Sequence, residues 1–261
     1  MIKKIILSFL LLGSALIAQT KVEYQISFIG MNMDYREYDS SDHILDSEKS
    51  DYSDISGVEI GYRFLLKNNT NISFNFVGVN GETQYLGSAL NSDQPYGSEV
   101  STTSNTIYDI SLGYNAKHML NSNVMMLGGI GVGYRYWQRE LSSIQIEEYT
   151  WYSVRVNAGV EFDYKDLSTS LIAEYQYGIK PEMTATGISD DFELSSANIV
   201  KISVPIRYAL TQNFDLSCAY VFEYQEIKES NVIYDGGTTG YVEPDSKAYN
   251  QYIKIGMIFK Y

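Results

Sequence analysis

The residue types best suited to acid–base or nucleophilic chemistry are scarce in this sequence. His43 and His118 are the only two histidines, and Cys218 is the only cysteine. A Ser/His/Asp hydrolytic set or a histidine-rich metal site needs imidazole groups close to their partners. The strand pattern described below places the two histidines at opposite ends of the fold, so only His43 could serve a hydrolytic set. The sequence therefore predicts no catalytic residue, no cofactor and no histidine metal site.

Acidic side chains crowd one polar stretch near the N-terminus. Carboxylate oxygens are the ligands that divalent cations such as calcium prefer. The spacing of these residues matches no defined calcium loop, so the favoured interpretation is a flexible, solvated loop. The residues are Asp39, Asp42, Asp46, Glu48, Asp51 and Asp54.

A larger set of charged residues occurs at every second position within otherwise apolar segments. If the uncharged faces of these segments meet lipid, the charged faces line the interior of a closed cylinder. A narrow lumen favours pairing of opposite charges into a plug; a narrow conducting pore, its selectivity set by the same charges, is the alternative. The predicted lumen residues are Glu59, Arg63, Asp109, Arg135, Arg155, Glu161, Glu174, Lys201, Arg207, Glu223 and Lys254.

The elements that position these charges are segments of alternating hydropathy. A period of two residues indicates β-strands, each with one face free of charge. Ten such segments predict an all-β fold, a closed antiparallel transmembrane barrel. Their uncharged faces span residues 22–28, 58–64, 72–76, 108–114, 124–136, 152–162, 171–177, 200–208, 214–224 and 253–261.

The joints between the segments alternate in length, which is typical of outer-membrane barrels with short periplasmic turns and long extracellular loops. An even strand number places both termini in the periplasm. Eight or twelve strands remain alternatives, because Gly78 and Gly81 blur the third segment, and Ile29, Met31 and Met33 suggest a bulge or change of face in the first. The short joints are 67–71, 118–123, 165–167 and 211–213, and the long ones 36–54, 87–104, 138–148, 181–195 and 230–247.

Four glycines lie close together in the fifth segment: Gly128, Gly129, Gly131 and Gly133. A nucleotide-binding glycine loop would need a helix after it, and none is predicted there. We expect these glycines instead where the wall curves sharply or where a bulky inward side chain opposite needs room.

The two ends of the chain favour export to the cell envelope. Residues 1–18 read as a signal peptide, with Lys3 and Lys4 before an apolar run, which leaves 19–261 as the barrel. The sequence ends on a strand of alternating apolar residues that is typical of a signal for the barrel-assembly machinery. These residues are Ile253, Ile255, Met257, Phe259 and Tyr261.

Charge limits the partners that this protein can have. The net charge is −13, and loss of Lys3 and Lys4 with the leader makes it −15. A chain this acidic is not expected to bind nucleic acid. The predicted partners are outer-membrane lipids, including lipopolysaccharide, and the assembly machinery of a Gram-negative cell envelope.

The layout resembles the omptins, the ten-stranded outer-membrane proteases. The resemblance is one of architecture over nearly the whole chain, with local likenesses at Gly129 to Trp137, Tyr152 to Gly159 and Tyr249 to Tyr261. It implies an Asp pair on one rim loop facing an Asp and His pair on another. The second long joint offers only Asp93, and the fourth offers Asp190 and Asp191 without a histidine. The resemblance thus extends to the fold and not to the proteolytic residues.

Three functions fit these observations. The leading one is a non-enzymatic barrel whose acidic extracellular loops act in surface interaction, adhesion or envelope integrity. The alternatives are a narrow porin-like channel with a charged lumen, and a divergent omptin-like hydrolase.

Overall fold

The computed structural model describes residues 21–88, 95–234, 237 and 240–261, so the predicted signal peptide lies outside the described residues. No helix in this part of the chain is long and apolar enough to cross a bilayer. The described part forms eleven strands: β1 (Lys21–Tyr38), β2 (Ile44–Lys49), β3 (Ile55–Leu65), β4 (Thr70–Gly87), β5 (Glu99–Met119), β6 (Val124–Ser142), β7 (Gln145–Tyr164), β8 (Leu167–Ala185), β9 (Phe192–Thr211), β10 (Phe214–Ser230) and β11 (Asp245–Lys260).

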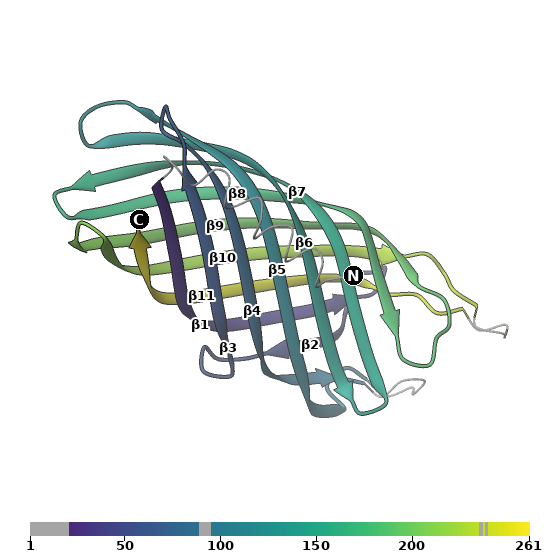
Figure 1. Cartoon of the computed structure of the whole chain (residues 1–261). Helices are drawn as coiled ribbons and strands as arrows, with labels where there is room; N and C mark the ends of the chain where they lie inside the picture. The colour runs from purple at the N-terminus through teal and green to yellow at the C-terminus, as the bar shows by residue number, and fades with distance from the viewer. Residues whose placement is uncertain (1–20, 89–94, 235–236, 238–239) are drawn as a thin grey trace.

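The strands pair antiparallel in a closed ring (Figure 1). Each long strand pairs with its neighbours in the sequence, and β11 closes the cylinder by pairing with β1 from Glu23↔Lys260 to Tyr38↔Asp245. A closed sheet leaves no unpaired edge, which a strand in lipid cannot tolerate. The predicted ten-stranded barrel is confirmed, because the ring holds ten strands at every level.

The eleventh strand does not add to the ring, because β2 takes over from β3 partway up the wall. β1 pairs with β3 up to Met31↔Ile55 and then with β2 from Asp34↔Lys49. β4 likewise passes from β3 to β2, with Lys49↔Gln84 as the first pair of the second set. The wall therefore stays closed while the chain turns between Ser50 and Asp54.

The joints differ at the two ends of the cylinder. One end, here called the turn end, has the short joints 66–69, 120–123, 165–166 and 212–213. Asn68, Asn69 and Lys165 adopt positive φ there, and asparagine tolerates this conformation well. The opposite end, the loop end, has the joints 39–43, 88–98, 143–144, 186–191 and 231–244, and residues 50–54 join β2 to β3.

Several loop-end joints are shorter than predicted, because the strands continue past the apolar band. Residues 138–148 were expected to be a loop, yet only 143–144 separate β6 from β7. A 19-residue strand such as β6 is about 60 Å long. At a tilt of about 40° it rises roughly 45 Å, well beyond an apolar band of about 25 Å.

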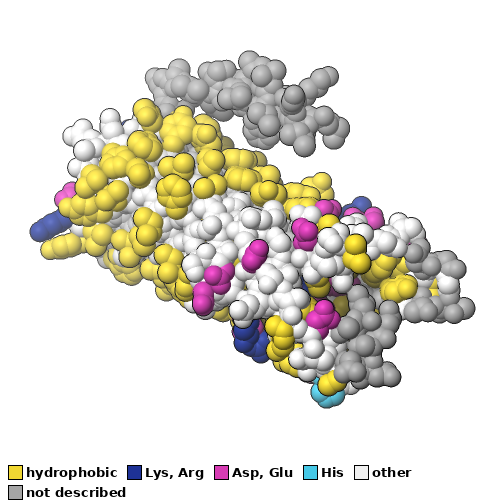
Figure 2. Space-filling model, turned by 90° about the horizontal axis from the view of Figure 1, so that it is seen from below, with side chains coloured by type: hydrophobic (Ala, Val, Ile, Leu, Met, Phe, Trp, Pro, Cys, Tyr) yellow, Lys and Arg dark blue, Asp and Glu magenta, His cyan; other side chains and the backbone are white. Residues whose placement is uncertain are grey.

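The outward face of each strand explains this extension. On β6 the outward residues pass from Tyr136 to Gln138 and Glu140, while the inward residues Trp137 and Arg139 stay buried. The wall thus leaves the lipid but keeps a filled interior. Figure 2 shows the apolar side chains gathered over one part of the surface and polar ones over the remainder.

Two ambiguous segments are regular in the structure. The first strand has no bulge at Ile29, Met31 and Met33, because its register with β11 is unbroken there. These side chains continue the inward face, which becomes apolar above Ser27, and they are 0–3% exposed. Gly78 and Gly81 lie inside β4, whose register with β5 is also unbroken.

Candidate functional site

The predicted lumen residues all lie on inward-facing positions, and all but Glu174 form ion pairs arranged in successive levels. Nearest the turn end, Arg63 and Arg207 both donate to Glu23 Oε2, at 2.8 and 3.3 Å. Lys117 pairs with Glu161 at the same end. Arg63, Arg207 and Glu161 belong to the predicted lumen set. Their partners Glu23 and Lys117 were not in that set.

Glu59 forms the next level from the β3 side of the wall. Its Oε1 accepts hydrogen bonds from Lys254 Nζ at 3.2 Å and from Asn75 Nδ2 at 2.9 Å. Gln25 donates to the other oxygen at 3.4 Å. The carboxylate on β3 therefore links to β1, β4 and β11, which are neighbouring strands of the wall.

A five-residue group, here called the middle network, crosses the centre of the barrel. Arg135 donates two hydrogen bonds to Glu223, at 2.9 and 3.1 Å. Lys201 approaches Glu223 at 2.9 Å, and Arg155 pairs with Asp109 at 2.9 Å. The middle network consists of Asp109, Arg135, Arg155, Lys201 and Glu223, and Glu174 lies opposite Lys201 in the β8–β9 register.

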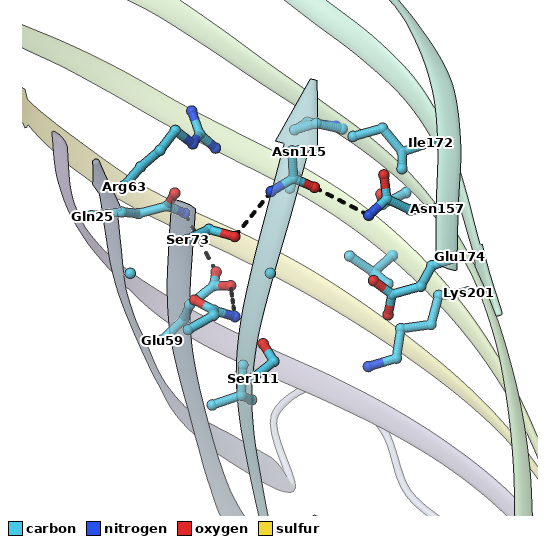
Figure 3. A pocket seen from close by; sticks show the side chains of 18 of the residues that line it. Gln25, Glu59, Arg63, Ser73, Ser111, Asn115, Asn157, Ile172, Glu174 and Lys201 are labelled. Carbon is cyan, nitrogen blue, oxygen red and sulfur yellow. Dashed lines mark hydrogen bonds between the residues drawn. The ribbon is translucent and has the colours of Figure 1, made fainter. Parts of the chain in front are cut away.

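A cavity of about 410 Å³ lies between the middle network and the turn end. Amide side chains form one side of it, as Figure 3 shows. Asn115 donates to Ser73 at 3.0 Å and accepts from Asn157 at 3.2 Å. Because these amides bond to one another, the lining offers polar groups on a rigid wall.

The β6 glycines make room for inward side chains, as predicted. A Cβ atom at Gly133 would lie 2.2 Å from the Arg155 guanidinium. One at Gly129 would lie 2.2 Å from the Asn115 amide oxygen. Gly128 points outward, where the nearest atom would be 4.0 Å away.

Above the middle network, toward the loop end, the lumen is filled by apolar and aromatic side chains. Trp137 stacks on Tyr149 with ring centroids 5.0 Å apart, and Tyr35 meets Trp137 edge-on at 5.2 Å. Met31 and Ile55 are completely buried beside them. This aromatic layer separates Arg135 from Arg139 on the same strand.

Arg139 is the centre of a second charged group that the sequence analysis did not predict as a site. Its side chain is 1% exposed, and it donates to Glu37 at 2.6 Å, Glu147 at 2.9 Å and Glu48 at 2.8 Å. Asp46 Oδ2 lies 3.9 Å from its Nη2. Glu243 accepts a 2.5 Å hydrogen bond from Tyr149, which also contacts Arg139. We call Arg139 and these five carboxyl groups the Arg139 cluster.

The interpretation of Asp46 and Glu48 as parts of a solvated loop was wrong. The two residues are 7% and 0% exposed, because β2 is part of the wall and directs them inward. Extending the period-two phase of 22–28 to Glu37, and that of 152–162 to Glu147, would have identified two further members. Glu243 lies outside the strands, so no periodicity marks it.

Burial shifts the acid–base behaviour of this cluster, which lies beyond the apolar band. Burial, followed by the nearby Glu37 charge, raises the pKa of Asp46 to about 9. Burial also raises the pKa of Glu243 well above its usual range, with Glu37 and Glu147 adding to the effect. One guanidinium cannot neutralise five carboxylates in a dry interior, so some of them bind protons.

The two histidines lie at opposite ends of the barrel. His43 is in the β1–β2 joint at the loop end, and His118 lies in the last turn-end residues of β5, which ends at Met119. His43 Nδ1 lies 3.1 Å from Asp39 Oδ2, with the imidazole 79% exposed. Asp190 and Asp191 are exposed in the β8–β9 joint, and Asp93 lies outside the described residues. Among the described residues no group of three or more His, Cys, Asp or Glu is arranged to hold a metal ion.

The last strand turns its alternate apolar side chains outward. Ile255 is 63% exposed, while Ile258 on the opposite face is buried. Tyr261 hydrogen-bonds through its backbone to Val22, which joins the two ends of the described chain. The role of Ile253, Ile255, Met257, Phe259 and Tyr261 as an assembly signal stays a prediction.

The closed ring, the apolar outer band and the ionic lumen together define a ten-stranded transmembrane β-barrel with the fold of bacterial outer-membrane proteins. No protein-family model matches the sequence, and no curated protein matches it.

Solved structures provide the comparison. The outer membrane protease OmpT from Escherichia coli has 11% identity and a TM-score of 0.60, with 92% of this chain and 97% of that one covered. The translocator domain of the autotransporter NalP from Neisseria meningitidis has 10% identity and a TM-score of 0.44, covering 95% and 92%. The attachment protein Ail of Yersinia pestis has 13% identity and a TM-score of 0.37, covering 92% and 99%. The architecture is therefore omptin-like.

Proposed function

We propose that this protein is a closed, non-conducting barrel of the bacterial outer membrane that acts through its loop end, in surface interaction or envelope integrity. In this proposal the loop end is extracellular, and both termini are periplasmic. Short turns on the periplasmic side and long loops outside are the arrangement of known outer-membrane barrels.

The observation that supports a non-conducting barrel is the unbroken filling of the lumen. The middle network, the aromatic layer and the Arg139 cluster follow one another along β6 as Arg135, Trp137 and Arg139. Each of these side chains is 0–2% exposed. An ion that entered the turn-end cavity would have to displace all three levels to cross.

Reconstitution in planar bilayers at neutral pH tests this proposal. We expect no stepwise conductance from wild-type protein whose barrel fold has been verified by circular dichroism. The cavity of about 410 Å³ favours the narrow channel as the second candidate. Stepwise currents at neutral pH, with ion selectivity that changes in Arg155→Glu, would establish the channel and refute the closed barrel.

A role in surface interaction is supported by like charges at the loop end. Glu182 and Glu193 lie opposite each other in the β8–β9 register and are both exposed. Like charges directly opposite are destabilising, so a cationic partner that covers them would relieve the repulsion. Asp190 and Asp191, in the joint between these strands, extend the same acidic surface.

Binding of polylysine to cells that display the protein tests the acidic surface. We expect binding that falls with added salt and that is reduced in the double variant Glu182→Gln, Glu193→Gln. The control is Glu226→Gln, because Glu226 is already paired with Lys228 at 3.0 Å. Equal binding by the double variant and the wild type would reject this surface as the interaction site.

We also propose that the protein is not an enzyme. His43 is highly exposed and meets only Asp39 among the described carboxylates within ion-pair distance, whereas a general base works from a fixed position beside its substrate. A basic peptide offered together with lipopolysaccharide should remain uncleaved. Cleavage that is lost in His43→Ala or Asp190→Ala would support the hydrolase instead.

A further inference from the structure

The Arg139 cluster joins segments that are far apart in the sequence at the mouth of the barrel. Glu37 comes from β1, Asp46 and Glu48 from β2, Glu147 from β7, and Glu243 from the connection between β10 and β11. All five are at most 9% exposed. A change in their charge therefore acts on several elements that close the loop end.

Asp46 is the member whose contacts are incomplete. Its Oδ1 atom is buried without a hydrogen-bond partner in the described structure, and its Oδ2 atom is 3.9 Å from Arg139. A buried carboxylate left in this state is costly, whereas a proton shared with a neighbouring carboxyl group removes the charge. The groups that interact with Asp46 are Tyr35 and Glu37 on β1, Glu48 on β2, Tyr85 on β4 and Arg139 on β6. Arg139 in turn contacts Glu147 and Tyr149 on β7, and Tyr149 donates to Glu243.

Two of the segments that carry these carboxyl groups, β2 and the connection that contains Glu243, have few strand pairs at the loop end. β2 pairs with β4 over only three residues, Ser47 to Lys49. In the described part of the connection that contains Glu243, an isolated bridge joins Ile233 to Tyr241, and the Ser230 N–H donates to the Glu243 carbonyl. Movement of these two segments away from the lumen would break the short pairs of β2 with β1 and β4 and would leave the pairs between the long strands intact.

We propose that the Arg139 cluster is a proton-operated closure of the loop end. Bound protons keep the inward carboxyl groups of β2 and of Glu243 packed in the lumen at acidic and neutral pH, and their release at alkaline pH opens the upper lumen to solvent. This goes beyond the proposed closed barrel, because it states when that barrel opens.

The direction follows from proton linkage. In the open state Asp46 and Glu243 meet water and titrate near the ordinary values of 3.8 for Asp and 4.5 for Glu, whereas in the closed state the pKa of Asp46 is about 9 and that of Glu243 is well above its ordinary value. Between these values the closed state binds more protons. Each proton released on opening lowers the ratio of closed to open molecules about tenfold per pH unit over that window.

The two tryptophans provide a direct measurement of opening. Trp137 and Trp151 are the only tryptophans, and they are 1% and 2% exposed in the lumen. In a Trp151→Phe background, Trp137 alone reports on the layer beneath the Arg139 cluster. Its quenching by acrylamide, a neutral probe that enters opened cavities, is measured in detergent micelles at about pH 5, 7 and 9.5. Circular dichroism verifies that the strands persist.

We expect the quenching constant to rise several-fold between about pH 7 and 9.5. The double variant Asp46→Asn, Glu243→Gln cannot ionise at these positions and should stay protected at about pH 9.5. The control double variant Glu182→Gln, Asp190→Asn, on the outer surface, should respond like the wild type. A constant that does not change with pH, or an equal rise in the Asp46 and Glu243 variant, would overturn the proposal while leaving the closed barrel intact. Conductance at neutral pH would refute the closed barrel independently.

Discussion

Arg139 donates two hydrogen bonds to the same oxygen of Glu48, from Nε at 3.0 Å and from Nη2 at 2.8 Å, with both side chains excluded from solvent. The residues come from β6 and β2, 91 positions apart in the sequence. This pair ties the short strand β2 to β6, past the intervening strands β5 and β4 of the wall. It belongs to the part of the lumen that extends beyond the lipid.

Replacement of Arg139 should reveal how strongly this pair holds the loop end. Arg139→Met leaves buried carboxyl groups without their cation, and removal of one partner of a buried ion pair costs about 3–5 kcal/mol. The loss should be smaller at acidic pH, where the carboxyl groups are protonated. The measurement is the free energy of unfolding in urea with detergent micelles. Arg36→Met is the control, because Arg36 forms an outward, partly exposed pair with Asp34 and should change stability by about 0–1 kcal/mol.

The middle network should be equally sensitive to the loss of one carboxylate. Glu223 accepts hydrogen bonds from Arg135, Asn250 and Tyr252 at 0% exposure. Glu223→Gln leaves Arg135 and Lys201 without their main counter-charge and should cost about 3 kcal/mol by the same assay. Glu174→Gln retains the oxygen that accepts from Gln176 and should cost at most about 1 kcal/mol. Similar losses in both variants would show that the Glu223 network has no special role.

The β6 glycines allow a test of lumen packing with neighbouring positions on one strand. Gly133→Ala places a methyl group against the Arg155 guanidinium, and such overpacking costs about 1–3 kcal/mol. Gly128→Ala points outward into open space and should leave the free energy of unfolding unchanged. Equal stability of the two variants would mean that Arg155 moves aside freely.

Orientation in the membrane can be read from cysteine labelling on intact cells. In a Cys218→Ala background, Ile144→Cys lies in the β6–β7 joint at the loop end, where Ile144 is 80% exposed. Asn123→Cys lies at the turn end. A membrane-impermeant maleimide should label the first variant fully and the second only after the cells are lysed. The reverse pattern would place the turns outside the cell.

The assembly role of the last strand can be separated from its packing. Phe214 and Phe259 contact each other with ring centroids 5.2 Å apart, so either alanine variant removes the same contact. If the C-terminal residues are an assembly signal, Phe259→Ala should lower the amount of folded barrel in the outer membrane well below that of Phe214→Ala. Equal amounts of folded protein in the two variants would indicate that Phe259 contributes packing and does not act as part of an assembly signal.

The sequence by itself determined the barrel and the position of its charged wall. Because side chains alternate across a strand, an uncharged stripe against lipid implies a charged stripe within, and Arg135, Arg155 and Glu223 could be placed before any coordinates. The count of alternating segments predicted ten strands, with eight or twelve as alternatives, and the ring has ten. The sequence also predicted that glycines such as Gly133 leave space for a bulky inward side chain on the neighbouring strand.

Only the tertiary structure decided what lies above the lipid and which charges meet. Beyond Tyr136 the outward face of β6 becomes polar, so the difference in hydropathy between the two faces disappears. The sequence therefore predicted a loop over 138–148 where the strands in fact continue. The pairing of Arg139 with Glu48, and the inclusion of Glu243, depend on contacts across the lumen between residues distant in the chain. Such contacts are fixed by closure of the cylinder and by the exchange of β3 for β2, which no local pattern of residues encodes.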